Sequence, residues 1–314
     1  MPINNAQAIA ALTKGLKLAF DKAYKEFEAG VNYTKIATVI SSDTDTEEYP
    51  WLGNAPGVRE WIGERQEGML KEFSYSIKNK TWENTIAVKR TALEDRKFGQ
   101  IKIRINDLAS NAAKYKDKLT FTALVTGLGT TEAAKCYDNQ YFFDTDHPAG
   151  DGATQSNKVT TALSATALQA GITAMALFAD DRGEAMGFVP DMLVVPPALQ
   201  WIAMELLEST MWPEVSGTAG TVKLANNVLK GKLELVVTPY VGSATSSTNW
   251  FLLCTKGVMK PIIFQDRTPI EFAAMEANSE AGFMRDEYTY GTRARYNVGY
   301  GLWQTAYGST GAGG

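Results

Sequence analysis

The feature that most constrains the fold is an alternating run at 69–90, which follows an irregular, tryptophan- and glycine-rich segment at 49–65. Apolar residues recur at alternate positions on both sides of a polar turn, Lys78-Asn79-Lys80, and this pattern predicts a two-stranded β-ribbon. An isolated hairpin is only marginally stable in water. The ribbon must therefore lie on another surface, and the neighbouring sequence offers no obvious cover. The pattern favours a second copy of the chain as that surface.

The apolar side of the ribbon and the nearby tryptophans supply the predicted contacts between subunits. The large apolar area of tryptophan suits burial at an interface. The predicted contact residues are Trp51, Trp61, Phe73, Tyr75, Ile77, Trp82, Ile86 and Val88. These features point to assembly rather than to catalysis.

Composition narrows the classes of function further. The chain has 314 residues, of which 45% are hydrophobic and 21% charged, enough for one large or two medium domains with a real core. Its net charge of −4 argues against a dedicated DNA-binding protein, although not against one that encloses nucleic acid. Two distant cysteines predict a reducing compartment, and no apolar run reaches the ~18 residues of a membrane span. We expect a soluble chain made in the cytoplasm.

In the first half, an amphipathic helix is predicted over 7–29, either packed on its own subunit or serving as an arm that docks on a neighbour. Residues 31–48 are predicted to be an extended linker. The segment Thr91–Glu94 matches a capping box, which predicts the start of a helical region. After a possible interruption at 99–105, a strongly periodic helix is predicted from Asn106 to about Gly127.

The second half mixes strands and helices. Ser164 is a predicted helix cap, and Pro196-Pro197 is predicted to open another helix through about Ser209. The predicted strands are Met192–Val195, Lys232–Thr238, Trp250–Thr255 and several after Met259. Residues 213–222 are predicted to be a mobile loop and 308–314 a floppy tail. The order of elements indicates an α+β protein.

One loop carries a candidate metal site, namely Asp144, Asp146 and the single histidine, His147. Its spacing fails the calcium-loop pattern, and too few histidines and cysteines lie nearby for zinc. Aspartates that cap local backbone amides explain it better. No phosphate-binding loop and no nucleophile elbow occurs in the sequence. The sequence therefore predicts no catalytic residue, no cofactor and at most a weak metal site.

Several separated segments resemble the Mu-like phage major head subunit family, and together they span nearly the whole chain. They are YPWLGNAPGVREWIGER at 49–65, CYDNQYFFDTDHP at 136–148, PDMLVVPPALQWIAMELLES at 190–209, NNVLKGKLELVVTP at 226–239 and RARYNVGYGLWQ at 293–304. The resemblance implies the Hong Kong 97-type capsid fold.

That fold divides the chain into named parts. The resemblance implies an N-terminal arm at 1–48, an extended loop region at 49–90, and a peripheral domain with a long spine helix at 91–186. An axial domain at 187–255 would meet its copies around five- and six-fold axes. Residues 256–314 would return to the peripheral domain as strands and a tail.

The resemblance also implies a function. The chain would be the major capsid protein of a tailed double-stranded DNA phage or a Mu-like prophage, self-assembling as hexamers and pentamers into an icosahedral head. Its implied partners are a scaffold protein, a maturation protease and a portal, with DNA enclosed but not specifically bound and no membrane involved. The implied location is the virion, and the host cytoplasm during assembly. The alternatives are an encapsulin-like nanocompartment and a soluble metal-dependent enzyme using Asp144, Asp146 and His147.

Overall fold

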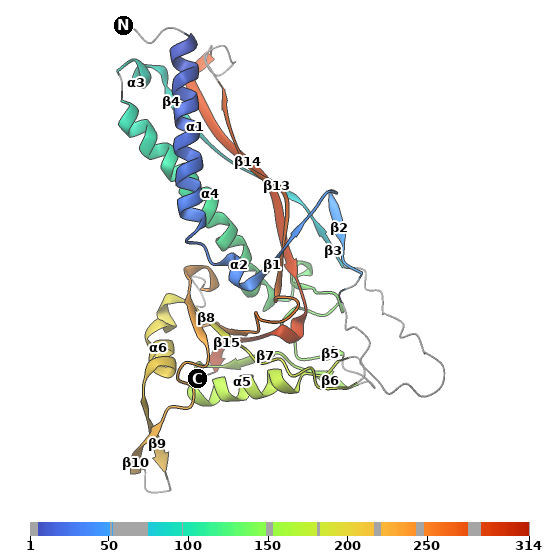
Figure 1. The fold of residues 1–314 in the computed structure, drawn as a ribbon. Helices are drawn as coiled ribbons and strands as arrows, with labels where there is room; N and C mark the ends of the chain where they lie inside the picture. The colour runs from blue at the N-terminus through green and yellow to red at the C-terminus, as the bar shows by residue number, and fades with distance from the viewer. Residues whose placement is uncertain are drawn as a thin grey trace.

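The computed structural model has two lobes that share one long helix and one long hairpin (Figure 1). It describes residues 6–50, 52, 75–95, 97–148, 153–180, 183–216, 221–242, 248–275 and 284–313. The upper lobe in this view holds α1, α3, most of α4 and a four-stranded sheet. The lower lobe holds a five-stranded sheet with α5 and α6. The predicted α+β class is confirmed.

The spine of the molecule is α4, Phe98–Gly127, which has 30 residues and is about 45 Å long at 1.5 Å per residue. The sequence predicted this helix from Asn106, with a possible interruption before it. That interruption is absent, because Ile101 and Ile105 are buried on the same side of the helix as Leu108. Burial of this apolar stripe outweighs the β-preference of the isoleucines.

The N-terminal helix α1, Ala6–Glu28, packs along α4 of its own chain. Leu16 and Phe20 are buried in a core that they share with α4. Where α1 ends, the Lys116 amine of α4 lies 2.7 Å from the Glu28 carboxylate. Of the two predicted alternatives, the structure shows the packed helix, at least for the described side chains of residues 11–28.

Residues 31–48 are structured, where an extended linker was predicted. They form α2 (Tyr33–Ile36), β1 (Ala37–Ser41) and β2 (Thr46–Glu48). Ile36 and Ala37 are buried, and β1 pairs in parallel with β13 (Ile262–Met275). The apolar run therefore forms part of a sheet, because its side chains fill the core beside α4.

The upper sheet has the strand order β1-β13-β14-β4, with β14 spanning Glu287–Tyr300 and β4 spanning Lys80–Lys89. One face packs on α1 and α4. The opposite face exposes polar side chains such as Glu83, Arg293 and Glu271, which neighbour one another across the strands. The sheet thus has one apolar face that packs on the helices and one polar face that is exposed to solvent.

The prediction that residues 69–90 form one two-stranded ribbon is wrong about which strands pair. The strand β3 (Ser76–Lys78) pairs with β2, and β4 pairs along its whole length with β14. Pairing with a ten-residue stretch of β14 lets the apolar side of β4 close the core over α4, which a free hairpin could not do. The first part of the predicted ribbon, up to residue 74, lies outside the described residues.

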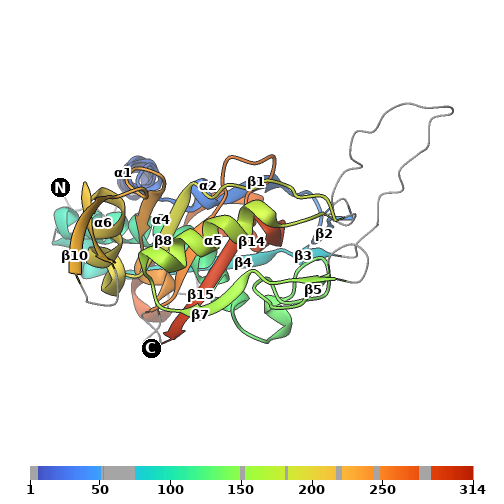
Figure 2. The ribbon, with the colours of Figure 1, turned by 90° about the horizontal axis from the view of Figure 1, so that it is seen from below.

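The lower sheet has the order β11-β8-β12-β15-β7. Its strands are β11 (Glu234–Val237), β8 (Met192–Val195), β12 (Trp250–Leu253), β15 (Ala306–Gly313) and β7 (Lys158–Thr161). The first three confirm the predicted strands. Seen from below, α5 (Ala165–Leu177) crosses in front of this sheet (Figure 2). The predicted cap is confirmed, because the Ser164 hydroxyl accepts a hydrogen bond from the Ala167 amide at 3.2 Å.

The helix predicted after Pro196-Pro197 is present as the 3-10 turn Pro197–Leu199 and α6, Gln200–Glu208. It is followed by a hairpin of β9 (Met211–Ser216) and β10 (Thr221–Asn226), where a mobile loop was predicted for 213–222. The remaining short elements are α3 (Arg90–Glu94), β5 (His147–Pro148), β6 (Thr154–Gln155) and 3-10 turns at Glu132–Ala134, Pro239–Val241 and Trp303–Thr305.

A strand, β15, occupies residues 306–313, where a floppy tail was predicted for 308–314, and residue 314 lies outside the described residues. β15 lies between β12 and β7, and Ser309 is fully buried. The sequence signal was misleading because small residues, which are typical of flexible tails, here allow close packing. A side chain at Gly308 would place its Cβ 2.8 Å from Cδ1 of Phe143. The predicted boundary between the axial domain (187–255) and the C-terminal part (256–314) lies between β12 and β15 in the sequence. These two strands pair with each other in one sheet.

We predict that Gly308→Val destabilises the subunit by about 1–3 kcal/mol, the usual cost of overpacking a closed core. Denaturant unfolding of the purified chain measures this change. The control is Gly257→Ala, whose Cβ would meet its nearest atom at 3.5 Å, an ordinary contact. Equal stability of the two variants would mean that β15 is not held tightly against Phe143.

Candidate functional site

The predicted contact residues lie in two groups. Trp51, Trp61 and Phe73 are outside the described residues. The other five, Tyr75, Ile77, Trp82, Ile86 and Val88, all pack against the cores of their own subunit. Ile77 is 3% exposed and Val88 is 9% exposed, so neither has free apolar surface to offer a neighbour.

Trp82 shows how this side of β4 is used. Its indole Nε1 donates a hydrogen bond to the Tyr296 carbonyl at 2.9 Å, and its ring lies 4.8 Å from the ring of Tyr115 on α4. The three side chains, with Ile270, line a cavity of about 320 Å³ between the sheet and the helix. The side of β4 that was predicted to face a neighbour faces the spine helix instead.

Exposed large apolar side chains occur at several places, among them Leu18 of α1 and Ile103 of α4, and one group of them lies at one end of the lower lobe. Four large apolar side chains there are exposed, and they come from α6 and the chain that follows it: Trp201, Ile202, Met211 and Val228. Trp201 is the largest of them and is 72% exposed. Figure 1 shows α6, β9 and β10 together at this end of the molecule. An indole left in water in this way is typical of a surface that a partner covers.

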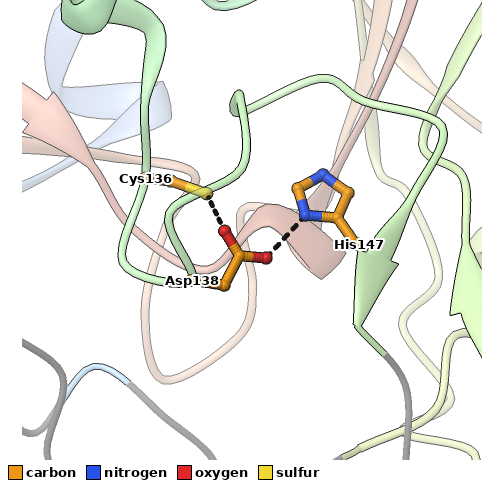
Figure 3. A group of neighbouring side chains, drawn as sticks. All are labelled: Cys136, Asp138 and His147. Atoms are coloured by element: carbon orange, nitrogen blue, oxygen red, sulfur yellow. Dashed lines mark hydrogen bonds and ion pairs between the residues drawn. The ribbon is translucent and has the colours of Figure 1, made fainter. Parts of the chain in front are cut away.

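A second feature is buried and polar (Figure 3). The Asp138 carboxylate lies between two other side chains: its Oδ1 is 2.9 Å from Sγ of Cys136, and its Oδ2 is 2.7 Å from Nδ1 of His147. The imidazole stacks on the indole of Trp303, with ring centroids 4.1 Å apart and an interplanar angle of 9°. We call Cys136, Asp138 and His147 the 136–147 cluster.

The candidate metal residues of the sequence do not come together. The Asp144 carboxylate accepts hydrogen bonds from the Thr145 amide at 2.8 Å and the Tyr141 amide at 3.3 Å, which confirms the capping interpretation for this residue. Asp146 is exposed, whereas His147 points into the protein. His147 instead bonds to Asp138, whose carboxylate also bonds to Cys136. The sequence analysis did not predict that these three residues lie together.

The missed residues are brought to His147 by a tight turn. The Cys136 amide donates to the Gln140 carbonyl at 2.9 Å, and Asn139 has φ 68°, a left-handed conformation that asparagine tolerates. The Asp-Asn pair at 138–139 was the one local signal of this turn. No short-range pattern indicates that the turn folds back onto His147.

The cluster is not a nucleophile with its base. Asp138 separates the thiol from the imidazole, so the histidine does not activate Cys136. Burial, together with the neighbouring Asp138 charge, holds the pKa of the Cys136 thiol well above its usual range. Burial also acts to raise the pKa of Asp138, but the hydrogen bond and charge of His147 and the Cys136 thiol outweigh it and lower that pKa. The cluster therefore combines a protonated thiol with a charged carboxylate.

Comparison with known protein families identifies the chain. It matches the model of the Mu-like prophage major head subunit gpT over residues 9–162, 156–241 and 242–312. The chain belongs to this family. The family is a structural component of a phage head and not an enzyme, so the chain is a major capsid protein of a phage virion. This assignment supports the head subunit over the nanocompartment and the metal-dependent enzyme.

Individual relatives agree with the family. The chain is 31% identical to the Mu-like prophage FluMu major head subunit of Haemophilus influenzae over 299 residues, which cover 94% of this chain and 72% of that protein. It is 26% identical to the major capsid protein of Escherichia phage Mu over 288 residues, covering 90% of this chain and 69% of that protein.

Comparison with solved structures identifies the fold. A chain in the procapsid of bacteriophage JBD30 matches with a TM-score of 0.54 and 30% identity, covering 95% of this chain and 75% of that one. A virus-like particle from Pyrococcus furiosus shares the fold, with a TM-score of 0.52 at 10% identity. The Hong Kong 97-type capsid fold implied by the resemblance is thereby confirmed. Across the part of the chain that the structure describes, no helix has the length and apolar character needed to cross a bilayer.

We predict that Trp82→Ala lowers the stability of the isolated subunit by about 2–3 kcal/mol, somewhat less than the ~3–5 kcal/mol typical of a fully buried aromatic residue. The loss arises because the contacts of the indole with the rings of Tyr115 and Tyr296 are removed. Denaturant unfolding measures it. Trp201→Ala is the matched control, and because Trp201 is exposed its stability should change by less than about 0.5 kcal/mol. Equal losses would place Trp201 in a core.

Proposed function

We propose that the chain self-assembles as pentamers and hexamers into the closed icosahedral head of a tailed phage or Mu-like prophage. Family membership supports the role of major head subunit. The observation that carries the mode of assembly is the exposed Trp201 at the end of the lower lobe. The upper lobe, by contrast, uses the apolar side of its sheet within one subunit.

The proposed contact around the five- and six-fold axes is centred on α6. Trp201 and Ile202 begin this helix, while Ala203, Leu206 and Leu207 are buried on its other side. The buried side fixes the helix on the five-stranded sheet, so the exposed side is held rigidly. A tryptophan on a rigid support loses little side-chain freedom when a partner covers it, which favours it as an energetic centre of the contact.

The open face of the upper sheet supplies a different kind of surface. Arg293 lies between Glu83 and Glu271 in the strand register, so charges of both signs alternate across the face. Such a face suits polar, salt-sensitive contact with neighbouring subunits rather than tight hydrophobic burial. Contacts of this kind would allow subunits to take slightly different angles at five-fold and six-fold positions.

The remaining partners belong to the same proposal. A scaffold protein, a maturation protease and a portal would act during assembly in the host cytoplasm, and double-stranded DNA would fill the finished head. The net charge of −4 supports enclosure without tight binding, because the chain has no excess of cationic side chains for phosphate contacts.

We predict that Trp201→Ala lowers the yield of closed particles at least about tenfold while leaving subunit stability unchanged. A tenfold effect corresponds to about 1.4 kcal/mol per contact, below the ~2 kcal/mol of an interface hot spot. The measurement is electron microscopy and size-exclusion chromatography of the chain expressed with its scaffold.

Leu177→Ala is the control, because Leu177 is similarly exposed but lies at the end of α5, away from α6. If Trp201→Ala forms closed particles at the yield of the unmodified chain, α6 is not at the centre of the contact. A loss in both variants would indicate that exposed apolar area in general, and not Trp201, drives assembly.

A further inference from the structure

The 136–147 cluster has no part in the shell contacts proposed above. The ligand atoms of Cys136, Asp138 and His147 all lie within 4.8 Å of one another. The side chain of His147 is fully buried and that of Asp138 is 3% exposed. Burying a thiol, a carboxylate and an imidazole together destabilises the folded subunit unless the charge of the group is neutralised.

The carboxylate of the cluster has few charged neighbours among the described residues. The carboxylate of Asp138 carries a negative charge, and apart from His147 no cationic side chain of the described chain forms an ion pair with it. Among the described side chains, only His147 and the Cys136 thiol therefore compensate this carboxylate, in an interior where an uncompensated charge is costly.

We propose that the 136–147 cluster binds one Zn²⁺ ion through Sγ of Cys136, a carboxylate oxygen of Asp138 and Nδ1 of His147. Sulfur, imidazole nitrogen and carboxylate oxygen are the three ligand types that zinc accepts in proteins. A dication balances one thiolate and one carboxylate, so the buried net charge becomes zero. Water completes the tetrahedral set of four ligands.

The protons of the two hydrogen bonds occupy the space that the ion would take. On binding, the thiol proton leaves to solvent, and the imidazole carries its proton on Nε2 instead of Nδ1. The oxygen–sulfur and oxygen–nitrogen separations, 2.9 and 2.7 Å, then each widen by roughly half an ångström, because all three atoms contact the ion directly in a tetrahedral arrangement.

The ligands are held in place before any ion arrives. The stacked Trp303 fixes the plane of the imidazole, and Trp303 is itself buried against Phe178. The turn at 136–140 fixes Asp138, whose Oδ1 also accepts a hydrogen bond from the Gln140 amide at 3.1 Å. Supports of this kind around the ligands are what distinguish a binding site from a chance group of polar residues.

The position of the cluster indicates what the ion would do. The chain between α4 and β5 carries Phe142 and Phe143, which are buried against Tyr300 and Phe251 of the two sheets. The cluster ties Cys136 and Asp138, which precede these two phenylalanines, to His147, which follows them. Zinc would therefore stabilise the joint between the spine helix and the lower lobe, and would take no part in catalysis.

The test uses the full-length purified chain, prepared without chelator. We expect about one zinc per chain by elemental mass spectrometry, and a melting temperature that falls by several degrees when a chelator removes the metal. Cys136→Ser and His147→Gln should lose the zinc and this chelator-dependent shift. Cys254→Ser is the matched control, because Cys254 is also a buried free cysteine but is not one of the three grouped ligand residues, and it should keep both.

A second measurement covers the case in which the variants do not fold. The unmodified chain loaded with Co²⁺ should show the absorption band of sulfur-to-cobalt charge transfer, which requires a cysteine thiolate as ligand. The proposal is overturned if the unmodified chain holds no zinc and gives no such band. It is equally overturned if Cys136→Ser retains the metal, or if Cys254→Ser loses it, since the metal would then be bound elsewhere.

Discussion

The whole molecule depends on the packing of one long helix, α4, against one long hairpin, β13–β14. These elements reach both lobes, and each contributes side chains to two separate hydrophobic cores. Ile101 and Tyr290 belong to the upper core, whereas Leu124 and Tyr300 belong to the main core. A shell subunit must keep its two lobes in a defined relation while it contacts several neighbours, and a continuous helix on a continuous hairpin supplies that stiffness.

The seam between the two cores is polar and buried. The amine of Lys116 bonds to Glu28 and lies over the rings of Tyr24 and Tyr33, at 5.6 and 5.5 Å from their centroids. Burial acts to lower the pKa of Lys116, but the surrounding tyrosines and Glu28 outweigh it and raise that pKa. The amine therefore stays charged. Because a buried charge without its partner is costly, this contact fixes the position at which α1 leaves the spine helix.

Local signals in the sequence were sufficient for local structure. The stripe of α4, the Ser164 cap and the strand at 192–195 follow from spacing over a few residues, and all are present. Such local signals do not predict which distant strands pair with each other. β4 pairs with a strand about 200 residues away, and β15 packs so closely against Phe143 that only glycine fits at position 308. The 136–147 cluster was missed for the same reason, since a turn and a stacked indole, not a spacing rule, bring its members together.

Residue type alone also could not separate packing from assembly. Trp82 and Trp201 are the same amino acid, and each lies in a segment with apolar neighbours at regular spacing. What differs is the surface across from them: Trp82 meets Tyr115 of its own spine helix, and Trp201 meets solvent. The apolar area that a shell keeps for its copies is therefore found only after the subunit has covered what it can by itself. In this chain the alternating strand closes the subunit, and the exposed side of a short helix at the far end is the contact that we propose for its neighbours.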